Sequence, residues 1–92
     1  MFTDQQLALA EAVLDACRQA GLRIAVAESC TGGLIAGCLT AVSGSSDVVE
    51  CGFVTYTNDA KMDLIGVRAD TLKAHGAVSP ETAIEMAAGA LS

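Results

Sequence analysis

The segment that decides the fold runs LRIAVA (22–27), ESCTGG (28–33) and LIAGCLT (34–40). Its first part is a short apolar run of strand length, and its last part is a small and apolar run that predicts a helix. The middle part turns the chain through hydroxyl residues and two glycines. A strand that turns directly into a helix is typical of α/β proteins.

Further elements are predicted on both sides of this segment. A capping box of Thr3 and Gln6 begins a helix, and Gly21 ends it in a left-handed cap. A second strand is predicted over 48–56, with Gly52 at a bulge or a close approach. A helix capped by Asn58 or Asp59 then runs to Gly66, residues 70–75 are helical, and Ser79-Pro80-Glu81 begins the last helix. We therefore expect one α/β domain over residues 1–92. Two strands make a poor sheet, so we also expect a domain cut short.

Composition and charge exclude several classes of protein. The 92 residues are 52% apolar, which excludes a disordered chain, and the thin aliphatic core favours a homo-oligomer. The formal net charge is -6, with no basic cluster, so nucleic acid and anionic membranes are not expected partners. No apolar run is long enough to span a bilayer, and the N-terminus has no positive n-region. These features predict a cytoplasmic protein.

The cysteines and acidic residues give no metal signal. The four cysteines form no C-x-x-C, and we expect reduced thiols that are mostly small core residues. Asp59 and Asp63 share a helix face, but a third ligand is missing. We expect no metal and no cofactor.

The turn at 28–33 is the candidate functional segment. Amide groups at a helix N-terminus are unsatisfied, and the glycines allow close approach of a ligand. Ser29 or Cys30 could be a nucleophile with its oxyanion donors on the same backbone, and Thr31 could cap the helix or donate to an anion. By its chemistry alone, the segment fits a structural turn equally well.

A serine nucleophile needs a base, and two residues are candidates. His75 is the only histidine, and its position at a helix end favours a structural role. Lys61 follows the second strand, and a desolvated lysine can act as a base. If the two strands are parallel neighbours, Ser29, Lys61 and Tyr56 share the edge where ligands of open α/β sheets bind. A solvated helix lysine is the alternative.

Motifs along nearly the whole chain resemble one family. They are, in order, Ala27–Ala36, Leu39-Thr40, Ser43–Ser46, Gly52–Asn58, Ala60-Lys61, Leu64–Val67, Gly76–Glu81 and Met86-Ala87. Together they resemble the C-terminal domain of the CinA family of bacterial competence- and damage-inducible proteins, which includes stand-alone nicotinamide mononucleotide deamidases. The family's later glycine loop is missing, and no pyrophosphatase-like domain precedes the first helix, so we expect an incomplete N-terminal portion of a stand-alone form.

The resemblance implies a fold, a reaction and a set of site residues. The fold is a three-layer α/β/α domain around a mixed sheet. The reaction is hydrolysis of nicotinamide mononucleotide to nicotinate mononucleotide and ammonia, in pyridine nucleotide recycling. Ser29 is implied as nucleophile, Lys61 as its base and Tyr56 as a proton relay. The implied substrate-binding residues are Glu28, Cys30, Thr31, Gly32, Gly33, Ser45 and Ser46, with the 31–33 backbone binding an anion.

Two other functions stay open at this point. One is a non-catalytic mononucleotide-binding or regulatory competence- and damage-inducible module, which would bind the mononucleotide without releasing ammonia. The other is a structural or assembly domain, favoured by the alanine-rich helices and the thin core.

Overall fold

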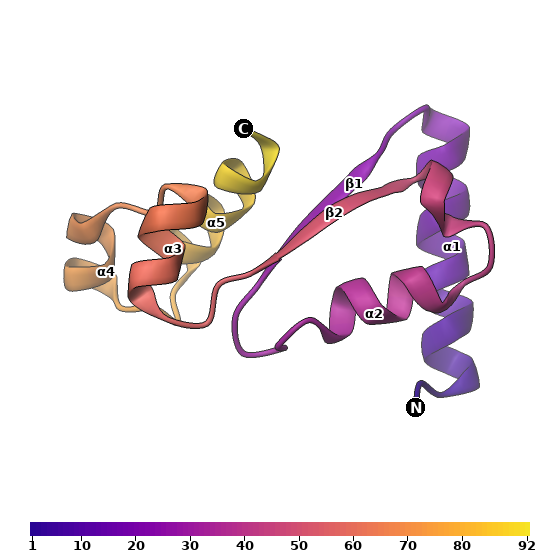
Figure 1. Cartoon of the computed structure of the whole chain (residues 1–92), viewed down its shortest axis with the longest axis horizontal. Helices are drawn as coiled ribbons and strands as arrows, with labels where there is room; N and C mark the ends of the chain where they lie inside the picture. The colour runs from indigo at the N-terminus through magenta and orange to yellow at the C-terminus, as the bar shows by residue number, and fades with distance from the viewer.

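The computed structural model describes all 92 residues (Figure 1). Its elements follow in the order α1 (Asp4–Ala20), β1 (Ile24–Glu28), α2 (Leu34–Ala41), a short 3-10 helix η1 (Ser45–Asp47), β2 (Val49–Val54), α3 (Asn58–Ile65), α4 (Ala69–His75) and α5 (Pro80–Leu91). None of the helices combines the length and the apolar character that crossing a membrane requires. The alternation of helices and strands is the one predicted, although both strands are shorter than expected.

Local sequence signals set most of the helix ends. Thr3 and Gln6 form the predicted capping box of α1, and Gly21 ends that helix with φ of 70°. Ser79 caps α5 by accepting from the amide of Thr82, with proline in the first turn as predicted. The cap of α3 is different, because Thr57 accepts from the amide of Ala60. Asn58 and Asp59 therefore lie inside the first turn of α3 and do not cap it.

The two strands are parallel neighbours in a two-stranded sheet. Glu28 at the end of β1 pairs with Val54 at the end of β2, so both strands finish at the same edge. Gly52 permits a close approach, because a Cβ there would lie 3.0 Å from a methyl group of Val26 and 3.3 Å from the Cβ of Ala36. The irregularity in the pairing lies instead between Ile24 and Ala25. The resemblance implies a mixed sheet, whereas the two strands of this chain are parallel to each other.

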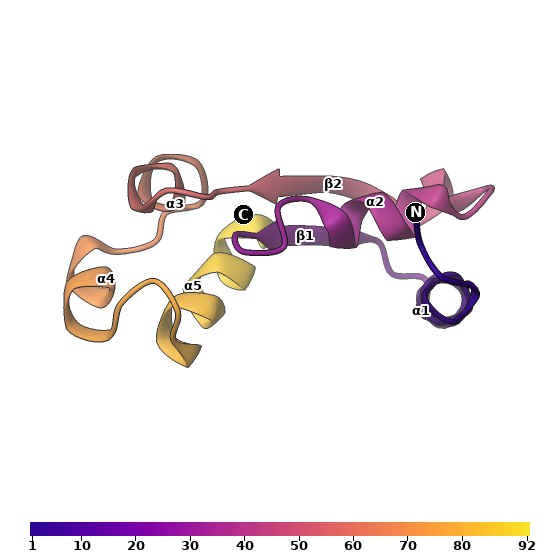
Figure 2. The same ribbon diagram turned by 90° about the horizontal axis from the view of Figure 1, so that it is seen from below.

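Helices cover both faces of this small sheet, which makes the fold a three-layer α/β structure. Side chains alternate between the two faces of a strand. Ile24 and Val26 pack against a cluster from α1 and α2, whereas Ala27 and Phe53 pack against a cluster that includes Ile65 and Met86. In both views, the strands run between the pair α1 and α2 and the group α3 to α5 (Figures 1 and 2).

The cysteines divide into two pairs by exposure. Cys17 and Cys38 are partly buried and pack against the cluster of α1 and α2, as expected for small core residues. Cys30 and Cys51 are exposed, which corrects that expectation for half of the thiols. All four thiols are free.

Candidate active site

The structure brings Ser29 and Lys61 together at the carboxyl edge of the sheet. Ser29 directly follows β1, and Lys61 lies in α3, which follows β2. Because the strands are parallel and end in register, the two residues meet although they are 32 positions apart in sequence. The Nζ atom of Lys61 lies 3.1 Å from the Oγ atom of Ser29, within hydrogen-bonding distance.

Lys61 is buried to an unusual degree for a lysine. Only 1% of the residue is exposed, and Nζ also donates to the carbonyl oxygens of Thr55 at 3.0 Å and Tyr56 at 3.2 Å. None of the ion pairs of the chain includes Lys61. Burying an ammonium group among neutral acceptors is costly, and an apolar side chain of similar length would fill the space at lower cost. A lysine in this setting, beside a serine, is typical of a functional site.

Thr55 links the two halves of the site, and sequence reasoning did not identify it. Its amide donates to the carbonyl of Glu28 at 2.8 Å, and its own carbonyl accepts from Lys61. The residue is fully buried, and its hydroxyl has no hydrogen-bond partner. Both linking contacts are made by the backbone, so no side-chain motif could have revealed them.

Glu28 lies next to Ser29, and its side chain is turned toward α2. The buried carboxylate accepts from the amides of Gly33 at 3.2 Å, Ile35 at 3.0 Å and Ala36 at 3.0 Å. Burial by itself would raise the pKa of Glu28. The hydrogen bonds from Ala36, Ile35 and Gly33, with a contribution from the Thr31 side chain, outweigh burial and hold the pKa below its ordinary value. The carboxylate therefore caps α2 from the strand end.

This contact determines which backbone amides of the turn are free. Gly33 is the N-cap of α2, so Thr31 is not the cap. The amide of Gly32 donates to the carbonyl of Ser29, and the amide of Gly33 donates to the Glu28 carboxylate. The amides of Cys30 and Thr31 donate to no protein acceptor. The amides available to an oxyanion are therefore those of residues 30 and 31. Of the expected 31–33 backbone donors only the one at 31 is free, and the amide at 30 was not among those expected.

Other predicted site residues have different surroundings. Tyr56 is 73% exposed, and its backbone carbonyl is the group that contacts Lys61. Cys30 is exposed beside Ser29. Ser45 is buried in η1 and the carbonyl of Ser46 accepts from Arg23, so both lie before β2, at the opposite end of the sheet from Ser29.

His75, the alternative base, lies at the end of α4. Its Nδ1 atom is 3.4 Å from a carboxylate oxygen of Glu81 in α5, and no hydrogen bond joins it to Ser29. The histidine thus belongs to the contact between α4 and α5. Of the two candidate bases, only Lys61 lies beside the serine.

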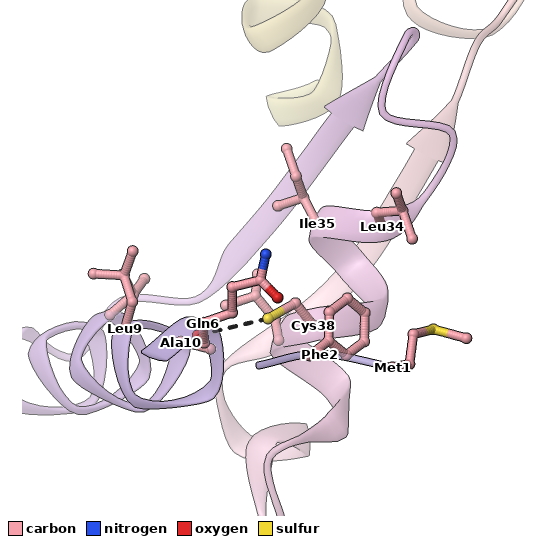
Figure 3. Close-up of a pocket in the computed structure, with 10 residues that line it drawn as sticks. Met1, Phe2, Gln6, Leu9, Ala10, Leu34, Ile35 and Cys38 are labelled. Carbon is pink, nitrogen blue, oxygen red and sulfur yellow. Dashed lines mark hydrogen bonds between the residues drawn. The ribbon is translucent and has the colours of Figure 1, made fainter. Parts of the chain in front are cut away.

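Two pockets of similar volume lie on different parts of the chain. Ser29 lines one of about 400 Å³, whose other lining residues are the apolar side chains of Ala25, Ala27, Ala83, Met86, Ala87, Ala90 and Leu91. The other, of about 430 Å³, lies between α1 and α2 and is lined almost entirely by apolar side chains such as Phe2, Leu9 and Ile35 (Figure 3). The first pocket has Ser29, the serine beside Lys61, in its wall, whereas the second has the thiol of Cys38.

The fold and the site together define an α/β protein in which a buried lysine contacts a partly exposed serine at the carboxyl edge of parallel strands. The chain belongs to the family of the CinA C-terminal domain, whose model matches residues 6–92. The resemblance seen in the sequence motifs is thereby confirmed.

Individual relatives agree with this assignment. A CinA-like protein of Chloroherpeton thalassium is 54% identical over 91 residues, which are 99% of this chain and 22% of the relative. The nicotinamide-nucleotide amidohydrolase PncC of Escherichia coli K12 is 51% identical over 90 residues, 97% of this chain and 54% of the relative. The crystal structure of the competence/damage-inducible protein CihA from Agrobacterium tumefaciens superposes with a TM-score of 0.94 at 54% identity, covering 99% of this chain and 55% of that one. The chain thus spans about half the length of PncC and CihA.

Proposed function

We propose that this chain contributes the catalytic serine and lysine of an amidohydrolase that acts on the carboxamide of nicotinamide mononucleotide. The observation that carries the proposal is the contact between a buried lysine without a carboxylate partner and a partly exposed serine. A structural lysine gains nothing from such burial, whereas a general base gains a fixed position beside its nucleophile. The relative named nicotinamide-nucleotide amidohydrolase supports the substrate.

The first chemical step is attack by Ser29 on the amide carbon. In the reacting form of the site, an uncharged Lys61 would keep two hydrogens on the carbonyls of Thr55 and Tyr56, which leaves its lone pair for the Ser29 hydroxyl 3.1 Å away. The lysine takes the hydroxyl proton as Oγ bonds to the carbon. The carbonyl oxygen becomes an oxyanion, for which the free amides of Cys30 and Thr31 are donors.

The second half of the cycle releases both products. The ammonium group of Lys61 returns its proton to the departing nitrogen, the carbon–nitrogen bond breaks, and ammonia leaves an ester on Ser29. Water then attacks this ester with Lys61 again as base, giving nicotinate mononucleotide and free Ser29. The sum is amide plus water to carboxylic acid plus ammonia, with no redox change.

Measuring ammonia release by a Ser29→Ala variant of the complete protein tests the proposal. We expect kcat to fall by about three orders of magnitude or more, because the covalent step is lost, while binding of nicotinamide mononucleotide changes little. Cys30→Ala is the matched control, and we expect it to keep most of the activity. If Ser29→Ala kept near-wild-type turnover, the serine would be excluded as nucleophile. A wild-type protein that bound the mononucleotide without releasing ammonia would favour the non-catalytic module.

A further inference from the structure

We propose that Glu28 is a positioning residue that holds Ser29 in contact with Lys61, and that it does not bind substrate. This inference rests on the proposed function. Only 2% of Glu28 is exposed, and the two oxygens of its carboxylate already accept from three amides at the start of α2. A substrate group could reach it only by displacing these bonds. Its contacts instead hold together the two ends of the turn between β1 and α2.

Glu28 connects the two ends of the turn, because it is the last residue of β1, directly before Ser29, and its side chain binds the start of α2. The turn leaves β1 at Ser29 and enters α2 after Gly33, and its glycines have φ of 59° and 100°. Within it, two backbone hydrogen bonds form, from Gly32 to Ser29 and from Leu34 to Thr31. The Glu28 side chain spans the whole turn and joins the last residue of β1 to the first turn of α2. Ser29 is thus the first residue of the turn, and the preceding residue, Glu28, holds the other end of the turn through its side chain.

The backbone of Glu28 also connects to the base. Its carbonyl accepts from the amide of Thr55, and the carbonyl of Thr55 accepts from Lys61. Lys61 then donates to Ser29, which closes a ring of contacts through Glu28 and Thr55. A shift of the turn by half an ångström would lengthen the 3.1 Å contact beyond a normal hydrogen bond. Misplacement of reacting groups by about 1 Å can cost a hundredfold in rate.

Glu28→Gln and Glu28→Ala test this role. Glutamine offers one acceptor oxygen in place of two, so its amide group must face at least one backbone N–H. Alanine removes all three contacts. We expect kcat for ammonia release to fall about tenfold in Glu28→Gln and about a hundredfold in Glu28→Ala, with KM within about threefold of wild type.

The matched control is Ser79→Ala, which removes the side-chain cap of α5. Loss of a cap costs about 1 kcal/mol of stability, so this variant reports what helix destabilisation alone does to activity. Both Glu28 variants and the control are assayed in the full-length protein well below their melting temperatures. We expect Ser79→Ala to keep wild-type kcat.

A second measurement separates this inference from the proposed function. The rate at which a fluorophosphonate modifies Ser29 needs an activated serine and no mononucleotide. We expect this rate to fall in both Glu28 variants by the same factors as kcat. If wild type reacted with the probe but released no ammonia, the substrate would be wrong, and the probe would still test Glu28. Wild-type probe reactivity in Glu28→Ala, a raised KM with unchanged kcat, or an equal loss in Ser79→Ala would overturn the positioning role.

Discussion

Replacing Lys61 by methionine should separate its chemical role from its role in packing. Methionine has similar length and no charge, so it fills the buried space without a proton acceptor. General base catalysis contributes about 10²–10⁴ in rate, which corresponds to about 3–5 kcal/mol of transition-state stabilisation. We therefore expect kcat for ammonia release to fall by at least a hundredfold in Lys61→Met.

The stability of the same variant should change much less. Two carbonyls, those of Thr55 and Tyr56, lose a donor, at about 1–3 kcal/mol for a group that stays buried. Removing an ammonium group from a buried position is favourable and offsets part of this loss. The hydrogen bond to the Tyr56 carbonyl is only partly buried, so water can replace the donor there. We expect the free energy of unfolding to change by no more than about 2 kcal/mol.

The assay compares kcat in wild type, Ser29→Ala, Lys61→Met and the double variant, with urea unfolding measured on each. Residues that act as one unit give non-additive losses, so the double variant should be no slower than the slower single variant. The matched control is Lys73→Met on α4, whose lysine is exposed and should be dispensable. A Lys61→Met protein within threefold of wild type, or losses that multiply in the double variant, would refute the serine–lysine unit.

Two further predictions concern stability. In Gly89→Ala the new Cβ would lie 1.9 Å from the carbonyl oxygen of Ile65, so we expect the free energy of unfolding to fall by an amount at or above the upper end of about 1–3 kcal/mol, and the melting temperature by more than about 10 °C. Ala88→Gly, at an exposed site on the same helix, should lose only about 1 kcal/mol of stability. An equal loss in both variants would exclude the clash. Because the pKa of Glu28 is lowered in the folded state, its contribution to stability is complete above the unfolded pKa of about 4.3 and is lost as the pH falls through the folded pKa. Urea midpoints from pH 6 to pH 3 should therefore fall less steeply in Glu28→Gln than in wild type, and parallel curves would contradict this linkage.

Much of the fold could be predicted because its signals are local. The capping box at Thr3, the left-handed Gly21 and the pair Ser79-Pro80 each act through neighbours in sequence, and each lies where it was expected. The cap of α3 was predicted wrongly as Asn58 or Asp59, because threonine, asparagine and aspartate stand side by side at 57–59 and all are good caps. The structure selects Thr57.

The site was predictable where it depends on topology and unpredictable where it depends on the backbone path. Parallel strands end at one edge, so the meeting of Ser29 and Lys61 follows from their places after β1 and β2. The contact of Glu28 with α2 follows from two left-handed glycines, which turn the helix start back toward the strand end. Sequence reasoning left Thr31 as either a cap or an anion donor. It did not identify Glu28 as the cap, because a side chain that caps across a whole turn leaves no periodic pattern.

The surroundings of Lys61 bear on how one group can serve as both base and acid. Two carbonyl oxygens can hold a neutral amine through its two hydrogens, and the same carbonyls with Ser29 can hold the ammonium through three. In the proposed reaction the lysine thus keeps its place through the whole cycle. A carboxylate beside it would favour the charged form and oppose its action as a base. Glu28, the nearest acidic residue in sequence to Ser29, could have been that carboxylate. Its charge is instead satisfied by the amides of α2, which leaves Lys61 among neutral acceptors and makes the capped turn part of the proposed chemistry.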